Sequence, residues 1–235
     1  MAGTLYLIPT TIGSDNWESV IPPLVINQTR DLKNFIVEDI RTTRRYLSKI
    51  GVNTPIDQIN FQVLNEHTKQ VEIEELIIPL LNGFDVGLLS EAGLPAVADP
   101  GSQIVAIANR KGIKVVPLTG PSSILLTLMA SGLNGQNFAF VGYLPIKPDE
   151  RRNRLKQLET RSRQEKQTQI FIEAPYRNVQ LFQDLLKLCN PETKLSIGLE
   201  LTTASEFIAT KKIREWNNST LPDLNKKNCV FCLMA

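Results

Sequence analysis

Cysteine and histidine are scarce in this chain of 235 residues, which contains three cysteines and one histidine. An odd and small number of cysteines argues against a disulfide framework and is typical of a reducing compartment. A single histidine without a cysteine array gives no zinc-binding pattern, so we expect no metal. No Ser/His/Asp or Cys/His set for nucleophilic catalysis stands out either.

Several sequence signatures are also missing. No GxGxxG follows the first apolar segment and no GxxxxGK[ST] occurs, so neither a standard Rossmann dinucleotide site nor a P-loop is predicted. No apolar run is long enough to cross a bilayer, and the first residues lack the basic and then apolar layout of a signal peptide. We therefore expect a cytoplasmic protein without a membrane segment.

Neither sign of charge dominates, because 26 Lys and Arg residues face 24 Asp and Glu residues, for a formal net charge of +2. The average charge therefore indicates no particular partner. Apolar residues make up 42% of the chain, enough to bury a core, and the length fits one large or two small domains.

Three apolar segments each end in a loop that precedes a helical pattern. Residues 4–8 run into Pro9 and a polar loop. The apolar run 86–89 stops at Ser90 and continues through a stretch rich in glycine and proline to Gly101, and residues 114–118 precede Thr119-Gly-Pro-Ser-Ser123. Such loops expose backbone groups at the carboxyl edge of a sheet, where open α/β folds bind ligands. We therefore predict an α/β fold in which these loops share one ligand.

Residues 33–38 resemble a further strand, which leads into a helix over 39–51 with Gly51 at its carboxyl end. Arg41, Arg44 and Arg45 are spaced to share one face of that helix. The face is either a solvated surface or an anion-binding surface. His67, the single histidine, is either a cap or surface residue or a functional group.

The second half of the chain has its own strands and helices, and we place the domain boundary near 134–136, giving domains 1–134 and 135–235. A polar helix with surplus positive charge is predicted over 149–166, as a phosphate contact or as ordinary surface. Strands are predicted over 138–144, 169–173, 194–201 and 229–234, and a polar stretch precedes the last. Cys229 and Cys232 lie on opposite sides at strand periodicity, which indicates packing rather than metal binding.

An ordered set of blocks covers nearly the whole chain and resembles the class III S-adenosylmethionine methyltransferases of the tetrapyrrole methylase superfamily. Within it, the blocks are most similar to the ribosomal RNA small subunit methyltransferase I family, which methylates a ribose 2′-hydroxyl of a 16S rRNA cytidine. The blocks are Gly3-Thr-Leu-Tyr with Pro9 and Ile12-Gly13, Glu38-Asp-Ile-Arg-Thr-Thr-Arg44, Ser90-Glu-Ala-Gly-Leu-Pro95 to Asp99-Pro-Gly101, Thr119-Gly-Pro-Ser-Ser123 with Ala130-Ser-Gly-Leu133, Phe140-Val-Gly-Tyr-Leu-Pro145 with Glu150-Arg-Arg152, Phe171-Ile-Glu-Ala-Pro175 with Arg177, and Glu200-Leu-Thr202.

The resemblance implies two α/β domains with S-adenosylmethionine in the cleft between them, a homodimer, and RNA of the small ribosomal subunit as partner. It assigns to the cofactor site the residues Pro9, Gly93, Leu94, Pro95, Val97, Ser122, Ser123, Ala174 and Thr202. It places Glu38, Asp39 and His67 at the acceptor, where spacing does not distinguish which one is the base. Arginines for the phosphates of the acceptor are Arg41, Arg44, Arg151, Arg152 and Arg177.

The chain departs from the family pattern at several positions. Thr11 replaces a proline, Glu91 an aspartate, Leu94 a threonine and Tyr176 a histidine, and the chain is without the usual C-terminal extension. We expect cofactor binding to survive these changes because backbone groups provide most of it. The changed loops are those expected to contact the acceptor.

Two other functions fit the same blocks. One is a methylase of a tetrapyrrole or another small molecule, because an acidic tetrapyrrole would also bind arginines. The other is a non-catalytic relative that binds cofactor or RNA, which the altered first loop keeps open. Methyl transfer from a sulfonium depends largely on positioning and needs no covalent residue, so the lack of a nucleophilic set is compatible with an enzyme.

Overall fold

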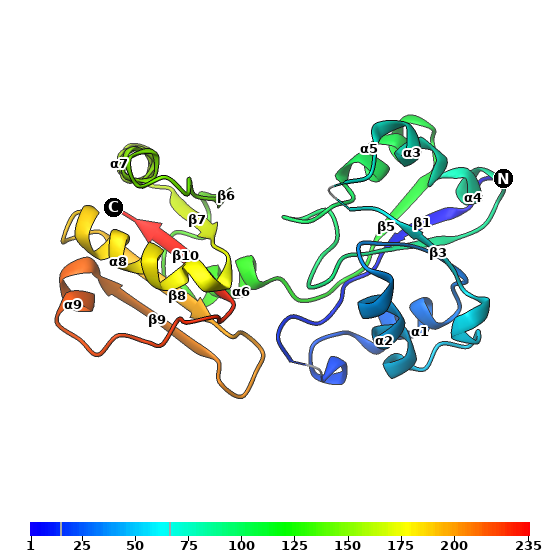
Figure 1. Ribbon diagram of the computed structural model, residues 1–235, viewed down its shortest axis with the longest axis horizontal. Coiled ribbons are helices and arrows are strands. Elements are labelled where there is room, and N and C mark those ends of the chain that lie inside the picture. Colours follow the sequence, from blue (N-terminus) through cyan, green and yellow to red (C-terminus); the bar gives the residue numbers. More distant parts are fainter. Residues whose placement is uncertain (15, 66) are drawn as a thin grey trace. The chain divides into compact units, whose positions relative to one another are not determined.

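The computed structural model describes residues 1–14, 16–65 and 67–235. The described chain forms two compact units, Met1–Ser122 and Ser123–Ala235, each with its own five-stranded sheet (Figure 1). Both sheets carry helices, so the predicted α/β fold is confirmed. No helix in the described part of the chain has the length and apolar content needed to cross a membrane.

The first unit contains a parallel sheet in the order β3-β2-β4-β1-β5. Its strands are β1 (Thr4–Leu7), β2 (Asn34–Val37), β3 (Asn60–Val63), β4 (Val86–Leu89) and β5 (Lys114–Pro117). Its helices are η1 (Trp17–Ser19), α1 (Pro23–Arg30), α2 (Ile40–Ile50), η2 (Ile56–Gln58), α3 (Gln70–Glu75), α4 (Ile78–Leu81) and α5 (Ser102–Arg110). The sequence of residues 71–81 predicts one helical run, which the structure divides into α3 and α4. Pro79, which has no N–H to donate, lies in the first turn of α4.

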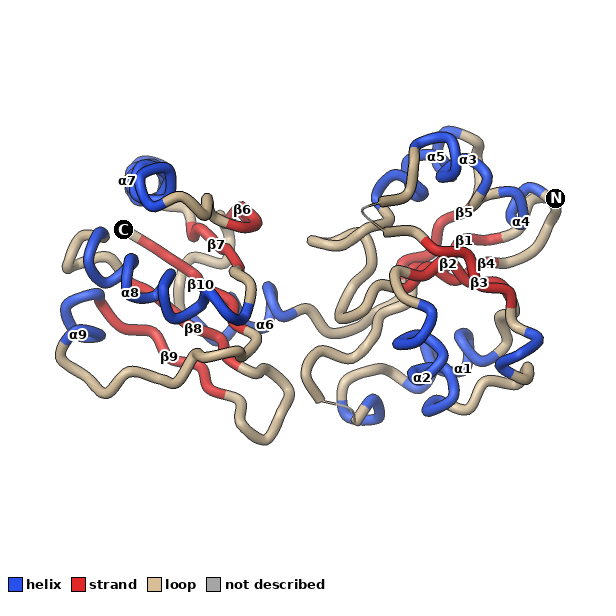
Figure 2. The backbone as a smooth tube through the Cα atoms, in the orientation of Figure 1, coloured by secondary structure: helices blue, strands red, loops and turns tan. Residues whose placement is uncertain are grey.

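Helices cover both faces of this sheet, as Figure 2 shows. On one face α1 and α2 pack with Phe35 and Leu89, and α2 contributes Leu47 and Ile50. On the other face α3, α4 and α5 enclose a second apolar cluster. The inner strands β2 and β4 are therefore covered on both sides, which explains why they are apolar runs rather than alternating patterns.

The neighbouring strands β1 and β4 send the chain to opposite faces of the sheet. From β1 the chain continues to α1, and from β4 it continues to α5, which packs in the opposite helix layer. In open α/β sheets, ligands bind at the carboxyl ends of strands where the connections diverge in this way. The fold therefore indicates the loops after β1 and β4 as the place where a ligand binds.

The second unit contains a mixed sheet in the order β6-β7-β10-β8-β9, in which only β6 and β7 are parallel neighbours. Its strands are β6 (Phe138–Tyr143), β7 (Thr168–Ile172), β8 (Lys194–Leu199), β9 (Phe207–Lys212) and β10 (Cys229–Met234). Its helices are α6 (Ser123–Ser131), α7 (Pro148–Glu165), η3 (Pro175–Arg177), α8 (Asn178–Leu188) and α9 (Ile213–Asn217).

The two faces of the second sheet carry different helices. The main core lies between the sheet and α7, α8 and α9, and it includes Cys229. The smaller cluster under α6 includes Cys232, so the prediction that these two cysteines face opposite sides is confirmed. Helix α6 approaches β8 closely because Gly198 has no side chain, and a Cβ there would lie 2.2 Å from the Thr127 hydroxyl oxygen.

Three features differ from the expectations. The structure groups residues 123–134 with the second unit, because α6 packs on the second sheet, so the division falls before the predicted boundary at 134. The apolar residues 122–131 predict a helix that is buried on nearly all sides, whereas in the structure Met129 of α6 is 79% exposed. Strand β9 and helix α9 lie in the stretch that the sequence predicts only as polar, because β9 is an edge strand that ends in two lysines.

Candidate active site

Loops from four strands of the first unit meet at the carboxyl edge of its sheet. Pro9 and Thr10 follow β1, Glu38 follows β2, Ser90 follows β4 and Gly120 follows β5. The Thr10 N–H donates to the Gly93 carbonyl oxygen at 2.9 Å, and the Thr10 hydroxyl donates to the Ser90 carbonyl oxygen at 3.5 Å. These bonds join the loops of the two strands where the chain diverges.

Glycine allows the loops after β1, β4 and β5 to lie in contact. A Cβ on Gly120 would lie only 2.1 Å from the Cβ of Pro9, so any other residue there would push the two loops apart. Gly93 has a φ of +78° and would bring a Cβ within 3.2 Å of Ile12. The structure thus brings together Pro9 and Gly93, two of the predicted cofactor residues, through backbone contacts.

The loop after β4 holds two alanines in the left-handed region, Ala96 with a φ of 65° and Ala98 with a φ of 64°. Such conformations are costly for residues other than glycine and persist where surrounding structure imposes them, often at ligand sites. Val97 lies between them and is 46% exposed, whereas Pro95 is buried and Leu94 half-buried. This loop therefore presents an exposed apolar side chain and backbone on a constrained frame.

Glu38 is half-buried at the carboxyl end of β2, and its Oε2 accepts a hydrogen bond from the Glu91 N–H at 3.2 Å. Burial raises the pKa of the Glu38 carboxyl above its ordinary value, and repulsion from Asp99, Glu91 and Asp39 adds to this against the lowering effect of the Glu91 N–H. Burial also raises the pKa of Asp99. A carboxyl with a raised pKa is a better proton acceptor near neutral pH.

Asp39, the next residue, has a different environment. It caps α2, where its Oδ1 accepts from the Thr42 N–H at 2.7 Å and from the Thr42 hydroxyl at 3.0 Å. These hydrogen bonds lower the pKa of Asp39. The structure thus separates two adjacent acids that the sequence left equivalent, because Asp39 is committed to the helix end.

His67 lies on the loop after the edge strand β3 and is exposed. Its backbone N–H donates to Asn65 Oδ1 at 2.9 Å, as in a local turn. Strand β3 pairs with β2, so His67 follows the strand beside the one that ends at Glu38. Sequence reasoning grouped His67 with Glu38 and Asp39, and the structure shows no contact between His67 and either acid.

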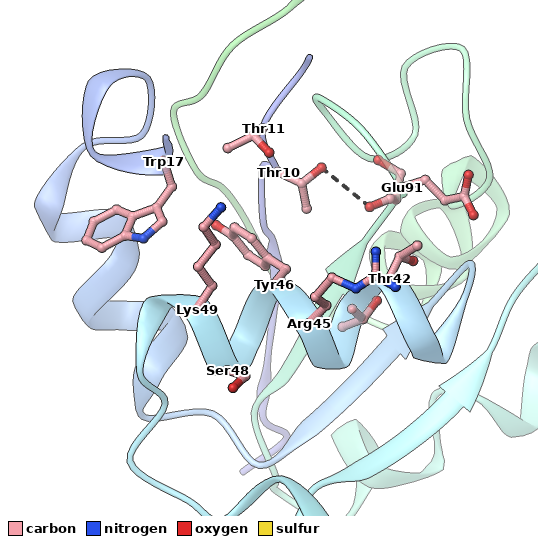
Figure 3. A pocket seen from close by; sticks show the side chains of 11 residues that line it. Thr10, Thr11, Trp17, Thr42, Arg45, Tyr46, Ser48, Lys49 and Glu91 are labelled. Carbon is pink, nitrogen blue, oxygen red and sulfur yellow. Dashed lines mark hydrogen bonds between the residues drawn. The ribbon is translucent and has the colours of Figure 1, made fainter. Parts of the chain in front are cut away.

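A pocket of about 450 Å³ lies beside this cluster, between α2 and the loops after β1 and β4 (Figure 3). The Tyr46 hydroxyl donates to the Pro9 carbonyl oxygen at 3.2 Å and so ties α2 to the first loop. Burial raises the pKa of Tyr46. The lining residues are Thr10, Thr11, Trp17, Thr42, Thr43, Arg45, Tyr46, Ser48, Lys49, Ser90 and Glu91.

The pocket changes the interpretation of the basic helix. Arg45 lines the pocket, whereas the Arg44 guanidinium lies 5.4 Å from the centre of the Phe61 ring, and Arg41 is exposed. All three arginines are exposed on α2, as their spacing predicts, but of the three only Arg45 is among the residues that line the pocket. The residues that share the pocket face are Thr42, Arg45, Tyr46 and Lys49, and their helical spacing was a signal that the sequence already carried.

In the second unit, Ala174 and Thr202 follow β7 and β8. Both strands are antiparallel to β10, so the two residues lie at the same edge of the second sheet. The Thr202 N–H donates to Glu206 Oε2 at 2.7 Å, and Thr202 has a φ of 68°, which is unusual for a β-branched residue. Ser123 begins α6, and Ser122, the last residue of the first unit, is 9% exposed.

Arg177 lies beside Ala174 and is held by a buried acid. Glu173 Oε1 accepts from the Ala174 N–H at 2.8 Å and from the Arg177 guanidinium at 2.6 and 2.9 Å. Hydrogen bonding to Glu173 raises the pKa of Arg177. Glu173 Oε2 is buried and has no hydrogen-bond partner among the described residues.

Arg151 does not lie where a phosphate could reach it. Its side chain is 5% exposed, and it donates to Asp184 Oδ2 at 2.8 Å and to the carbonyl oxygens of Pro145 and Ile146. The expectation that Arg151 contacts phosphate is therefore corrected to a structural role between α7 and α8. Arg152, the next residue, is exposed, with Asp149 at 3.5 Å.

Comparisons with known proteins find relatives in sequence and neighbours in fold. A family model described as tetrapyrrole (corrin/porphyrin) methylases matches residues 28–217. The ribosomal RNA small subunit methyltransferase I of Vibrio cholerae is 32% identical over 234 residues, covering 100% of this chain and 77% of the relative. The protein of that name from Escherichia coli is 33% identical over 234 residues, covering 99% and 77%.

Among solved structures, the methyltransferase CobJ matches with a TM-score of 0.65 and 16% identity, over 99% of this chain and 94% of that chain. The cobalt precorrin-4 methyltransferase CbiF matches with a TM-score of 0.61 and 12% identity, over 98% and 94%. At these identities the two structures show a shared fold and nothing more specific.

Proposed function

Since this chain belongs to the tetrapyrrole methylase family and, within it, to the ribosomal RNA small subunit methyltransferase I family, we propose that it methylates a ribose 2′-hydroxyl of 16S rRNA. It is an S-adenosylmethionine-dependent methyltransferase. The charges and the proton acceptor at the candidate site support a nucleotide acceptor.

The strand-end loops fit S-adenosylmethionine. The contacts at Gly120 and Gly93 leave backbone rather than side chains at the carboxyl edge, which suits a ligand with many polar groups and little net charge. The nearby carboxylates of Glu38 and Asp99 suit the positive charges of the ligand. When bound, this group supplies an electrophilic methyl group. The residues proposed to hold it are Pro9, Gly93, Leu94, Pro95, Val97, Ser122, Ser123, Ala174 and Thr202.

The observation that carries the acceptor proposal is the environment of Glu38. A ribose hydroxyl must lose a proton when it is methylated, so the site needs a base. Glu38 is half-buried with a raised pKa, whereas Asp39 is an N-cap with a lowered pKa. Glu38 would therefore accept the proton at its carboxylate. Asp39 would position Glu38 by fixing the start of α2, and His67 remains a candidate for contact with the acceptor.

Cations for an RNA backbone lie in both units. Arg41, Arg44 and Arg45 are exposed on α2, and Arg152 is exposed on α7. Helix α7 carries a half-buried cation, Arg154, and further exposed cations at Lys156, Arg161, Arg163 and Lys166, with the last at its end. Arg177 is partly exposed beside Ala174. Phosphate contacts of this kind would make binding of RNA fall steeply with salt.

The relatives favour RNA over a tetrapyrrole acceptor. Proteins named for ribosomal RNA match at 32% and 33% identity across this chain, whereas the methyltransferase CobJ and the cobalamin biosynthetic enzyme CbiF match at 16% and 12%. The higher identity to the proteins named for ribosomal RNA supports an RNA acceptor.

The proposal includes a cytoplasmic location, where small ribosomal subunits are found, and a homodimer. Cys189, Cys229 and Cys232 are free and buried, as expected in a reducing compartment. Exposed apolar side chains that would suit a subunit interface in the second unit include Met129 at 79% and Ile146 at 62%. Light scattering at several protein concentrations would give the oligomeric state, and a monomer throughout would exclude the dimer.

The test is transfer of a labelled methyl group from S-adenosylmethionine to small ribosomal subunits that lack their native methylations. We expect label on one 16S ribose, located by nuclease mapping. Free 16S rRNA and a tetrapyrrole serve as parallel acceptors, and Glu38→Gln serves as the inactive control. Binding of the cofactor without any labelled rRNA would overturn the acceptor while leaving the family assignment intact.

A further inference from the structure

The pocket beside Glu38 combines features that the methyl donor does not require. Its lining comes from three segments of the first unit: the loop after β1 with η1, helix α2, and the start of the loop after β4. Its volume of about 450 Å³ falls in the range of pockets that hold small organic groups. The pocket is thus large enough to have an occupant of its own.

The side chains of the pocket indicate the chemistry of that occupant. Trp17 and Tyr46 provide aromatic surface, and Figure 3 shows Lys49 extending between them. Arg45 supplies a second cation and takes part in no ion pair among the described residues. Aromatic surface beside cations is the combination on which proteins stack bases and bind phosphates of single-stranded RNA. The hydroxyls of Thr10, Thr11, Thr42 and Ser48 add donors and acceptors for a ribose or a base edge.

The pocket is rigidly placed next to the proposed base. Trp17 packs against the core under α1 and α2 without being fully buried. Tyr46 is tied to Pro9 at 3.2 Å, and Thr10 to the loop after β4. Glu91 lines the pocket and also donates its N–H to Glu38. Glu91 would therefore lie between an occupant of the pocket and the Glu38 carboxylate that takes the proton.

We propose that this pocket binds one nucleotide of the acceptor RNA strand, with its base against Trp17 and its phosphate at Arg45 and Lys49. The inference rests on the proposed function and names how the RNA is held beside Glu38. Trp17 and Arg45 are positioning residues in this account, because they hold the strand and do not touch the transferred group. Their loss raises the KM for ribosomal subunits and leaves the affinity for S-adenosylmethionine unchanged.

The fluorescence of Trp17 gives a direct test. The chain has two tryptophans, and the other, Trp216, is 1% exposed, so a change on ligand addition reports Trp17. A short single-stranded RNA is expected to quench the emission, and the quench is expected to disappear in Trp17→Phe. Cytidine 5′-monophosphate and S-adenosylmethionine are the comparison ligands. Quenching by S-adenosylmethionine alone would make the pocket part of the cofactor site and overturn the proposal, as would no quench with RNA.

Kinetics of four variants complete the test. Trp17→Ala and Arg45→Ala should each raise the KM for small subunits roughly 10-fold, the size expected for a lost base stack or phosphate contact, and Trp17→Phe should recover most of it. Arg110→Ala, which removes an equal charge from α5 in the opposite helix layer, is the matched control. Circular dichroism melts check that each variant is folded.

The outcomes distinguish this inference from the proposed function. If small subunits are methylated and both pocket variants keep the parent KM, the nucleotide pocket is wrong while the function stands. If RNA quenches Trp17 and no rRNA is methylated, the pocket stands while the acceptor is wrong. An equal KM increase in Arg110→Ala would show that the increase comes from the loss of positive charge in general rather than from the pocket, and it would overturn the proposal.

Discussion

At the scale of single residues, Glu38 and Asp39 show how neighbouring acids acquire different roles. The Glu38 carboxyl is half-buried and accepts one backbone N–H, while Asp39 accepts both the N–H and the hydroxyl of Thr42. The first environment disfavours the charged form and the second favours it, which gives the opposite pKa shifts. One position therefore suits proton transfer and the other suits helix capping.

Replacing each acid by its amide should separate these roles. Glu38→Gln is expected to lower kcat for rRNA methylation by about 100-fold or more, because the proton acceptor is lost. Asp39→Asn keeps a capping side chain and should change stability by less than about 1 kcal/mol. Rapid single-turnover assays and thermal melts measure the two effects. Equal loss of kcat in both variants would contradict the assignment of Glu38 as the base.

The raised pKa of Glu38 also predicts how stability depends on pH. A carboxyl whose pKa is higher in the folded state stabilises the fold below its ordinary pKa of 4.5 and loses that contribution as the pH rises through the folded value. Glu38→Gln removes this pH-dependent loss of stability, because an amide side chain does not ionise. Its free energy of unfolding should therefore exceed that of the parent at pH 7, and by a smaller margin at pH 4. Urea titrations at the two pH values measure this, and a gap that shrinks at high pH would contradict it.

Arg151 and Arg152 are adjacent arginines with different surroundings. Arg151→Ala leaves Asp184 without its buried partner and should cost roughly 3 kcal/mol of folding stability, with RNA affinity unchanged in the folded protein. Arg152→Ala should cost less than about 0.5 kcal/mol and weaken RNA binding. Denaturant titration and RNA binding at two salt concentrations compare them. A stable Arg151→Ala with weakened RNA binding would restore its predicted role as a phosphate contact.

At the scale of elements, the contact between the loops after β1 and β5 depends on one missing side chain. Gly120→Ala places a Cβ 2.1 Å from that of Pro9 and forces the loops apart. We expect about 1–3 kcal/mol of destabilisation and at least about a 10-fold weaker affinity for S-adenosylmethionine. Gly135→Ala is the control, because nothing lies within 4 Å of its added Cβ. Calorimetric titration measures the affinity, and an unchanged value would exclude this loop contact from the cofactor site.

Sequence reasoning predicts elements well where a local signal exists. The helix from Ile40 to Ile50 has both of its predicted ends, because Asp39 and Gly51 are capping residues with a local mechanism. Strand β9 was missed because an edge strand with lysines at its end lacks a two-sided apolar pattern. The pocket was missed because Trp17 and Tyr46 approach each other only through the packing of η1 and α2.

At the scale of the whole molecule, each unit encloses its own apolar clusters. We therefore expect two thermal transitions in calorimetry. Leu47→Ala, at a fully buried position of the first unit, should lower one of them and Arg151→Ala the other. A single transition that moves as a whole with either variant would show that the units unfold as one.

The sequence by itself determined the α/β class, the family, most strand and helix positions, and the strand-end loops, because these depend on local periodicity, capping residues and ordered motifs. The tertiary structure decided which residues of those loops have which role. Burial and neighbours distinguish Glu38 from Asp39, an ion pair removes Arg151 from the surface, and packing of α2 turns Arg45 toward a pocket. Each of these depends on residues distant in the sequence, since pKa, exposure and pocket shape are set by what surrounds a side chain in space.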